Sequence, residues 1–343
     1  SPVLLKPARL EAEPRSAGGP AAMRLLAPLL AWYLGRGLAQ DLSAALGGPQ
    51  RGLGSVAAAP APPRLPRRIG VVGVGTIGSA VVRGVLRAPA GRLAQEEAPS
   101  FVLSPRNAAK VAALRAEFPS KVTVARDDQQ VVDEADCVVL GLPGPVAVDV
   151  IRSLRFRGDQ QVVSLVAAVK FPQLQALLGP GVSCTVALPT PAIAKRRGST
   201  IGFPWRPYAE ALFSVTGSYT AAESLEQFTR LASVGAFAGD FYRRQLAIQQ
   251  WLTRHGVEEA RAAAYVGEVF ATFAADSEAA GPDTFARLVS EQTPGGLNEM
   301  VWKQQEAAGV YAAVEHSLDA VYRRNSNGTA ALPWTPADSL ETV

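Results

Sequence analysis

The chain has 343 residues, of which 48% are hydrophobic, so it can bury a sizeable core and is not a disordered protein. Its formal net charge is +4, but the seven Lys/Arg and three Asp/Glu of residues 1–66 account for the whole excess. The neutral remainder excludes nucleic-acid binding as a main function. Cys137 and Cys184 fall in apolar runs and predict two buried thiols in a reducing compartment, and neither His255 nor His316 has a metal-ligand pattern.

Residues 1–66 differ in composition from the rest of the chain. An apolar, helix-compatible stretch from Met23 to Leu46 carries two arginines, and an Ala/Pro-rich linker follows from Ala57 to Pro66. An Arg-bearing, acid-poor leader is typical of organelle-targeting segments, which would place the protein in a plastid or mitochondrion rather than the cytoplasm. An extension without a fold is the alternative interpretation. The apolar stretch is too short and too interrupted to predict a membrane span.

The clearest motif begins after a short β-branched run, Ile69–Val72, and ends in a helical pattern, Ser79–Leu86. A strand, a G-x-G-x-x-G turn and a helix in this order predict a dinucleotide site, with a plain β–α turn as the alternative. The glycines allow a tight turn, close approach of a pyrophosphate and close packing of helix on strand, while helix N–H groups face the phosphates. The expected cofactor contacts in this turn are Gly73, Gly75, Thr76, Ile77 and Gly78.

The end of the next strand, Phe101–Leu103, indicates which cofactor is bound. An NAD site expects an acidic residue there, which would hold the ribose hydroxyls. This chain instead has Ser104, Arg106 and Asn107. Arginine can pair with a 2′-phosphate and the other two side chains can donate hydrogen bonds to it, so we predict NADPH as the cofactor. The alternative is that Arg106 is a solvated residue at a helix start.

Short apolar strands continue to alternate with helical patterns as far as residue 220. This alternation predicts a Rossmann-type, mostly parallel sheet, an NADP-binding domain of residues 67–220 and an α/β fold class. Loops at the carboxyl ends of the strands line the ligand crevice, so Leu142, Pro143 and Ala167 join the expected cofactor contacts. The further strands are expected at residues 122–124, 136–140, 161–165, 182–188 and 212–216, with helices at 127–135 and 146–154.

From residue 221 to 325 only helical patterns remain. Apolar residues recur at helical spacing, which predicts an all-helical dimerisation and substrate domain shared between protomers. The chain is therefore expected to form a homodimer or a higher homo-oligomer, and residues 326–343 a disordered tail. The helices are expected at residues 223–231, 241–254, 257–275, 285–292 and 296–325.

One break in the helical half has the composition of an anion-binding turn. Thr293-Pro294-Gly295-Gly296-Leu297-Asn298 ends one helix and begins another. Two glycines at a helix start expose backbone N–H donors to a small carboxylate. The alternative is an ordinary helix–helix turn with an N-cap threonine.

These two motifs in this order resemble the pyrroline-5-carboxylate reductases over residues 67–325. The 293–298 turn is similar to the family's Ser-Pro-Gly-Gly-x-Thr turn, Leu188–Pro191 to its Met-Pro-Asn-Thr-Pro segment and Ser164–Ala168 to its Ser-x-x-Ala-Gly segment. The Asn of the family's Met-Pro-Asn-Thr-Pro segment has no counterpart in Leu188–Pro191. Ser233–Phe237 match poorly the family's Ser-Gly-Ser-Gly-Pro-Ala-Tyr helix start. The resemblance implies NADPH-dependent reduction of a small imino acid, pyrroline-5-carboxylate, to proline.

The resemblance also implies roles for residues of the turn. Thr293, with the backbone of Gly295 and Gly296, would bind the substrate carboxylate, beside Leu297. Asn298 would replace the family's threonine near the imine nitrogen, so Thr293 and Asn298 are the expected catalytic residues. Glu278 is a further candidate for substrate binding, as an acidic residue ahead of the turn.

Two rival functions stay open at this point. The first is an NADPH-dependent reductase of another imine, a ketone or a hydroxy acid. Hydroxy-acid dehydrogenases of related architecture usually place a lysine near the nicotinamide, and residues 223–291 contain none. The second rival is a catalytically silent NADPH-binding or regulatory protein, which the weak match at Ser233–Phe237 supports. No metal, membrane or nucleic-acid partner is expected.

Overall fold

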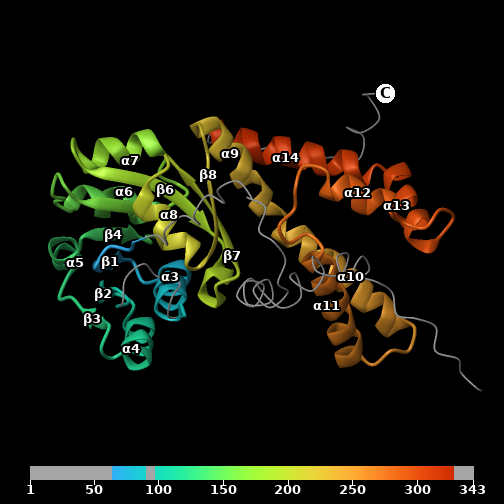
Figure 1. The fold of residues 1–343 in the computed structure, drawn as a ribbon, viewed down its shortest axis with the longest axis horizontal. Coiled ribbons are helices and arrows are strands. Elements are labelled where there is room, and N and C mark those ends of the chain that lie inside the picture. The colour runs from blue at the N-terminus through green and yellow to red at the C-terminus, as the bar shows by residue number, and fades with distance from the viewer. Residues whose placement is uncertain (1–63, 90–96, 328–343) are drawn as a thin grey trace, which may run out of the picture. The chain divides into compact units, whose positions relative to one another are not determined.

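The computed structural model describes residues 64–89 and 97–327, so the expectations for residues 1–63 and for the tail beyond 327 lie outside the described residues. Within them eight strands form one sheet in the order β3-β2-β1-β4-β5-β6-β7-β8 (Figure 1). The strands are β1 (Arg68–Val72), β2 (Ser100–Leu103), β3 (Val122–Val124), β4 (Cys137–Leu140), β5 (Gln161–Ser164), β6 (Ser183–Pro189), β7 (Gly198–Phe203) and β8 (Gly217–Ala221).

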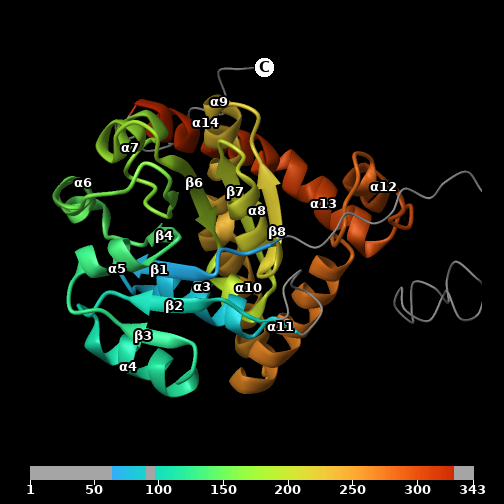
Figure 2. The same cartoon turned by 60° about the vertical axis from the view of Figure 1, so that its left-hand side comes forward.

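The predicted Rossmann-type topology is confirmed. The six strands β3, β2, β1, β4, β5 and β6, in this order across the sheet, are parallel to one another. Because β1 lies between β2 and β4, the strand order reverses at β1. In such sheets ligands bind at the carboxyl ends of the strands, at this reversal. At the other end of the sheet β7 pairs antiparallel with β6 and parallel with β8, and Figure 2 shows these three strands side by side.

Helices cover both faces of the sheet because both faces of its strands are apolar. Alternate residues of a strand point to opposite faces: Ile69 and Val71 join one buried cluster, and Val72 joins the other. Helices α3 (Thr76–Leu86), α4 (Ala108–Glu117) and α8 (Pro207–Ser214) contribute to the first cluster. Helices α5 (Asp128–Glu134), α6 (Gly144–Ser153), α7 (Phe171–Leu178) and α9 (Leu225–Val234) contribute to the second.

The strand expected at residues 212–216 is wrong. Residues 207–214 form helix α8, in which Leu212 and Phe213 are fully buried. A short run that is apolar on every side has no period that separates a buried strand from a buried helix. The sheet is completed instead by β7 and β8, which are rich in Gly, Ser and Thr and have few apolar side chains.

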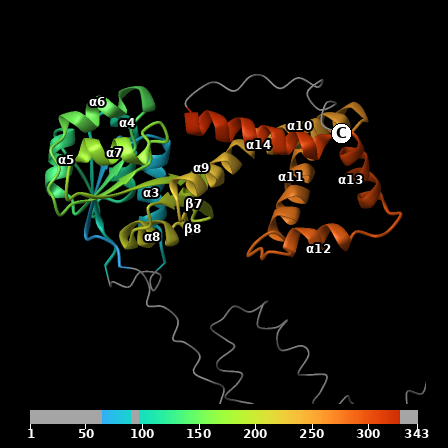
Figure 3. The ribbon, with the colours of Figure 1, turned by 90° about the horizontal axis from the view of Figure 1, so that it is seen from above.

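The helical half begins where the last strand ends, at Ala221. It contains α9, α10 (Ala238–Arg254), α11 (Glu259–Ala275), α12 (Thr284–Ser290), α13 (Leu297–Ala307) and α14 (Val310–Asn327), which Figure 3 shows from above. The single helix expected at residues 296–325 is wrong, because the chain breaks at Gly309, whose φ of 72° is left-handed. Two 3₁₀ turns, Pro191–Lys195 and Gly235–Phe237, complete the described elements.

The two cysteines are buried free thiols, as the sequence predicts. Cys137 lies in β4 and Cys184 in β6. Burial, with the negative charge of Asp136 beside it, raises the pKa of Cys137 to about 12, and burial also raises the pKa of Cys184. Neither thiol is therefore poised to react as a thiolate.

No helix among residues 64–89 and 97–327 is both long and apolar enough to cross a membrane. The same part of the chain contains no group of three or more His, Cys, Asp or Glu side chains that could hold a metal ion.

Candidate functional site

A cleft of about 410 Å³ lies at the carboxyl ends of β1, β2 and β4, where the strand order reverses. It brings together residues from four segments that are far apart in the sequence, those that follow β1, β2, β3 and β4, as the motifs predict for a nucleotide site. The residues that line the cleft are Gly73, Val74, Gly75, Ser104, Arg106, Asn107, Ala108, Asp128, Gly141, Leu142 and Pro143.

The glycine turn between β1 and α3 is tight on one side and open on the other. Gly73 has a left-handed φ of +92°, and a Cβ there would lie 2.6 Å from the carbonyl oxygen of Gly141. A Cβ on Gly78 would lie 2.6 Å from the carbonyl oxygen of Gly73. A Cβ on Gly75 would meet only the Gly141 oxygen, at 3.9 Å, so the space above Gly75 is free.

The start of α3 is suited to phosphate groups. Gly75 is its N-cap residue, no side chain caps the helix and its first turn carries no acidic residue. The first N–H groups of the helix and its dipole are thus left for an anion. Thr76 and Ile77 are the first residues of α3, and the Thr76 hydroxyl accepts a hydrogen bond of 3.2 Å from Lys110 Nζ. A dinucleotide pyrophosphate therefore fits this turn.

The end of β2 carries the cationic part of the cleft. Arg106 is 68% exposed and its guanidinium lies 3.6 Å from the Asp128 carboxylate, at the start of α5. Asn107 Oδ1 accepts from the Lys110 N–H at the start of α4, which leaves the Asn107 Nδ2 atom as a donor. Ser104 lines the cleft, is buried, and accepts from the Gly73 N–H at 2.9 Å through its hydroxyl oxygen. It therefore fixes the glycine turn.

Sequence reasoning missed Lys110, whose ammonium group bonds to Thr76 beside the cleft, and four residues that line it: Val74, Ala108, Asp128 and Gly141. Lys110 lies in the first turn of α4, four positions after Arg106, and this second basic residue so soon after β2 is a signal that could have identified it. Asp128 comes from the loop after β3, and nothing in the sequence indicated that it would pair with Arg106.

Of the other predicted cofactor contacts, Leu142 and Pro143 line the cleft and Ala167 does not. Ala167 lies instead on a separate cavity of about 210 Å³, beyond the carboxyl ends of β5 and β6. The aromatic rings of Phe171, Phe203 and Phe228 pack in series there, with centroids 5.4 and 6.5 Å apart. The cavity is lined by Ala167, Val169, Lys170, Phe171, Val186, Leu188, Phe203, Leu225, Phe228, Thr229, Ala232 and Asn325.

The second motif forms the turn between α12 and α13, as expected, but two of its predicted donors are engaged. The Gly295 N–H donates to Glu299 Oε2 at 2.7 Å, and the Gly296 N–H donates to the Thr293 carbonyl oxygen at 2.9 Å. Glu299 Oε1 in turn accepts from Lys303 Nζ at 2.8 Å. Glu299 is three residues beyond the N-cap Gly296, the position from which a glutamate commonly reaches back to cap a helix.

The side-chain amide of Asn298 is held in one orientation by its neighbours. Gln292 Nε2 donates to the Leu288 carbonyl oxygen at 2.8 Å, which turns Gln292 Oε1 toward Asn298. Asn298 Nδ2 donates to that Oε1 atom, also at 2.8 Å. Asn298 Oδ1 is thereby left as a hydrogen-bond acceptor on an exposed residue.

Glu278 and the cofactor cleft are both separate from this turn in the described protomer. Glu278, expected near the substrate, pairs instead with Arg197, at 3.3 Å, from the loop before β7. No residue of the described helical half lines the cofactor cleft. A single protomer therefore does not join the two predicted motifs in one pocket.

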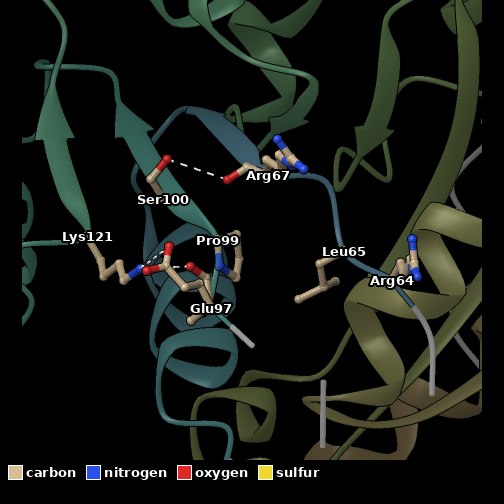
Figure 4. A pocket seen from close by; sticks show the side chains of 8 residues that line it. Arg64, Leu65, Arg67, Glu97, Pro99, Ser100 and Lys121 are labelled. Carbon is tan, nitrogen blue, oxygen red and sulfur yellow. Dashed lines mark hydrogen bonds and ion pairs between the residues drawn. The ribbon is translucent and has the colours of Figure 1, made fainter. Parts of the chain in front are cut away.

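A third cavity, of about 560 Å³, is excluded as the cofactor site by its position. It lies at the amino ends of β1, β2 and β3, the opposite edge of the parallel sheet from the glycine turn (Figure 4). Lys121 Nζ donates there to the Ala98 carbonyl oxygen at 3.0 Å and lies 3.9 Å from Glu97 Oε2.

Comparison with known proteins shows what the chain is similar to. Residues 68–168 match the family model described as NADP oxidoreductase, coenzyme F420-dependent. The chain is 23% identical over 270 residues to pyrroline-5-carboxylate reductase 2 of Bacillus subtilis, covering 76% of this chain and 94% of the relative.

Solved structures of similar fold include pyrroline-5-carboxylate reductases from three organisms. The Coxiella burnetii enzyme has a TM-score of 0.63 at 18% identity and covers 77% of this chain and 98% of its own. The Streptococcus pyogenes enzyme has a TM-score of 0.62 at 19% identity, with coverage of 75% and 97%. The Plasmodium falciparum enzyme, solved with NADP bound, has a TM-score of 0.61 at 12% identity, with coverage of 75% and 96%.

The resemblance that the two motifs predict is therefore confirmed at the level of the fold, which spans nearly the whole length of each of these three enzymes. Residues 68–168 match an NADP oxidoreductase family model, and the chain has the fold of the pyrroline-5-carboxylate reductases.

Proposed function

We propose that the protein is an NADPH-dependent reductase of a five-membered cyclic imine, with two candidate substrates: pyrroline-5-carboxylate, which would be reduced to proline, and 1-pyrroline, which lacks the carboxylate. The observation that carries the proposal is the cleft of about 410 Å³, which joins an open glycine turn to the exposed guanidinium of Arg106. The similarity to reductases of this kind over most of the chain supports the substrate class.

The residues of the cleft bind the cofactor at two places. The first N–H groups of α3, beside Gly75 and Thr76, hold the pyrophosphate. Arg106 and Lys110 lie to one side and hold the 2′-phosphate, with Asp128 orienting the arginine. NADPH, when bound, supplies the hydride that reduces the C=N bond.

A homodimer completes the site by bringing the 293–298 turn of a second copy to this cleft. The helical half exposes large apolar side chains that a monomeric protein would bury, and α10, α12 and α13 have no buried residue. These exposed side chains include Phe241, Tyr242, Trp251, Tyr265, Phe273, Phe285, Val289, Leu297 and Met300. Large apolar side chains exposed in this number are typical of an interface between copies of one chain.

Asn298 acts on the substrate through its free Oδ1 atom. A protonated imine nitrogen carries one N–H donor, and an amide oxygen accepts from it. The Gln292 side chain fixes the orientation of the Asn298 amide, so the acceptor is held in place before the substrate arrives. Asn298 positions the imine and does not transfer a proton.

The activity is tested with NADPH and two ring imines, pyrroline-5-carboxylate and 1-pyrroline, by following the absorbance of NADPH together with NADPH binding on the same sample. We expect reduction of at least one imine and no reduction of a panel of ketones and 2-keto acids. Turnover of a ketone alone would replace the proposal by another reductase. NADPH binding without turnover would make the protein a cofactor-binding protein without this activity.

The Asn298→Ala variant separates substrate positioning from cofactor binding. Loss of the acceptor is expected to lower kcat for the preferred imine by about 10- to 100-fold, the effect of losing one hydrogen bond to a charged group. NADPH affinity should stay unchanged, because Asn298 does not line the cofactor cleft. Gln304→Ala, an exposed position on the same helix, is the matched control. Undiminished turnover in the Asn298 variant would remove this residue from the mechanism.

A further inference from the structure

The two predicted glycine turns, at the starts of α3 and α13, differ in the charge of the helical turn that follows them. The α3 turn has no acidic residue in the first helical turn, so its N–H groups remain for phosphate. The α13 turn has Glu299 in the first helical turn, and the Glu299 carboxylate already accepts the N–H of Gly295. The second turn thus carries an anion of its own.

Both oxygen atoms of Glu299 are bound. Oε2 accepts from the Gly295 N–H at 2.7 Å, and Oε1 accepts from Lys303 Nζ at 2.8 Å. The Glu299 side chain is 24% exposed and is thus better shielded than that of Lys303, which is 57% exposed. The lysine and then the glycine N–H lower the pKa of Glu299, so its carboxylate is ionised at neutral pH.

Two neighbouring donors of the turn are also engaged within the protein. Asn298 gives one of its two Nδ2 hydrogens to Gln292, which fixes the orientation of its amide. The Gly296 N–H is used by the Thr293 carbonyl oxygen. A ring carboxylate that binds the Gly295 N–H would have to displace the Glu299 carboxylate from it, whereas a protonated imine without a carboxylate requires no such displacement.

We propose that Glu299 is a specificity-determining residue: its carboxylate competes with the carboxylate of the substrate for the Gly295 N–H, and so favours cyclic imines that lack this group. The inference rests on the proposed function, because it takes the α13 turn as the place where the ring imine binds. It assigns a role to a residue outside the six positions of the turn motif, from its contacts alone.

The Glu299→Gln variant removes the charge and keeps the size and the acceptor oxygen of the side chain, so the helix start is preserved. It is expected to raise kcat/KM for pyrroline-5-carboxylate about tenfold, the effect of removing a charged competitor for one hydrogen bond. The value for 1-pyrroline should stay within about twofold, since that ring has no carboxylate to gain the N–H. Glu306→Gln, an exposed glutamate on the same helix, should change neither value.

A binding measurement decides the inference without any turnover. Calorimetric titration at saturating NADP⁺ should give L-proline an affinity about tenfold higher in Glu299→Gln than in the unmodified protein, and pyrrolidine, which lacks the carboxylate, an equal affinity in both. Equal L-proline affinity in the two proteins, or no L-proline binding by either, overturns the role of Glu299. Absence of imine turnover in every variant while NADPH binds would instead overturn the proposed function, and the proline titration would still report on Glu299.

Discussion

Replacing Gly78 by alanine is expected to lower the free energy of unfolding by about 1–3 kcal/mol, the usual cost of overpacking. Replacing Gly75 by alanine should instead leave the stability unchanged and weaken the binding of NADPH. The methyl group added at Gly78 would lie 2.6 Å from the Gly73 carbonyl oxygen, a backbone atom that cannot move without opening the turn. The methyl group added at Gly75 would meet only one atom, at 3.9 Å, and would occupy the space through which a pyrophosphate approaches.

The two glycine variants are compared by thermal unfolding without cofactor and by fluorescence titration with NADPH. A loss of roughly 2–10 °C in Tm is expected for Gly78→Ala, and at least a tenfold rise in the NADPH Kd with an unchanged Tm for Gly75→Ala. Gly158→Ala, at an open position with no atom within 4 Å, is the control for the added methyl group. Tight NADPH binding by the Gly75 variant would show that the cofactor does not lie against this turn.

Replacing Arg106 by alanine should raise the KM for NADPH by roughly 10- to 100-fold, which corresponds to losing one or two charge-assisted hydrogen bonds to a phosphate. The KM for NADH should change little, because NADH has no 2′-phosphate. Arg106 is 68% exposed over the cleft, and its only described ionic partner is Asp128, at 3.6 Å, so its loss leaves the fold intact. The KM for NADPH of Arg106→Lys should lie between those of the unmodified protein and of Arg106→Ala, since lysine binds phosphate without the planar fork of arginine.

Steady-state kinetics with both cofactors measure this selectivity. Arg115→Ala is the matched control, because Arg115 is an exposed arginine near the end of α4, the helix that follows Arg106, and lies outside the cleft. An equal rise in KM for NADPH and NADH would mean that Arg106 acts on the shape of the cleft. An unmodified protein that prefers NADH would contradict the assignment of the cofactor itself.

The sheet was predictable where a strand is apolar and ends at a glycine or a polar loop, as β1 does before Gly73. The last two strands were not predictable, because β7 and β8 consist largely of Gly, Ser and Thr, and their pairing depends on neighbours distant in sequence. The break at Gly309 was missed because a single glycine inside a helical pattern is often tolerated, and only its left-handed φ identifies it as a terminus.

The candidate site was predictable as two separate turns but not as a network of contacts. The spacing of the glycines identified the cofactor turn, and the run after Leu103 identified Arg106. The roles of Ser104 and Glu299 depend on which backbone N–H each side chain reaches, at 2.9 and 2.7 Å, and spacing alone does not determine this.

The two buried thiols make the protein a convenient subject for distance measurements. Cys137 and Cys184 are the only cysteines of the chain, and both are enclosed within the parallel strands. A single cysteine placed at an exposed position will therefore take a spin label or fluorophore selectively, with no need to remove the native ones. Labels on the glycine turn of one copy and on the α13 turn of another would measure their separation directly in solution.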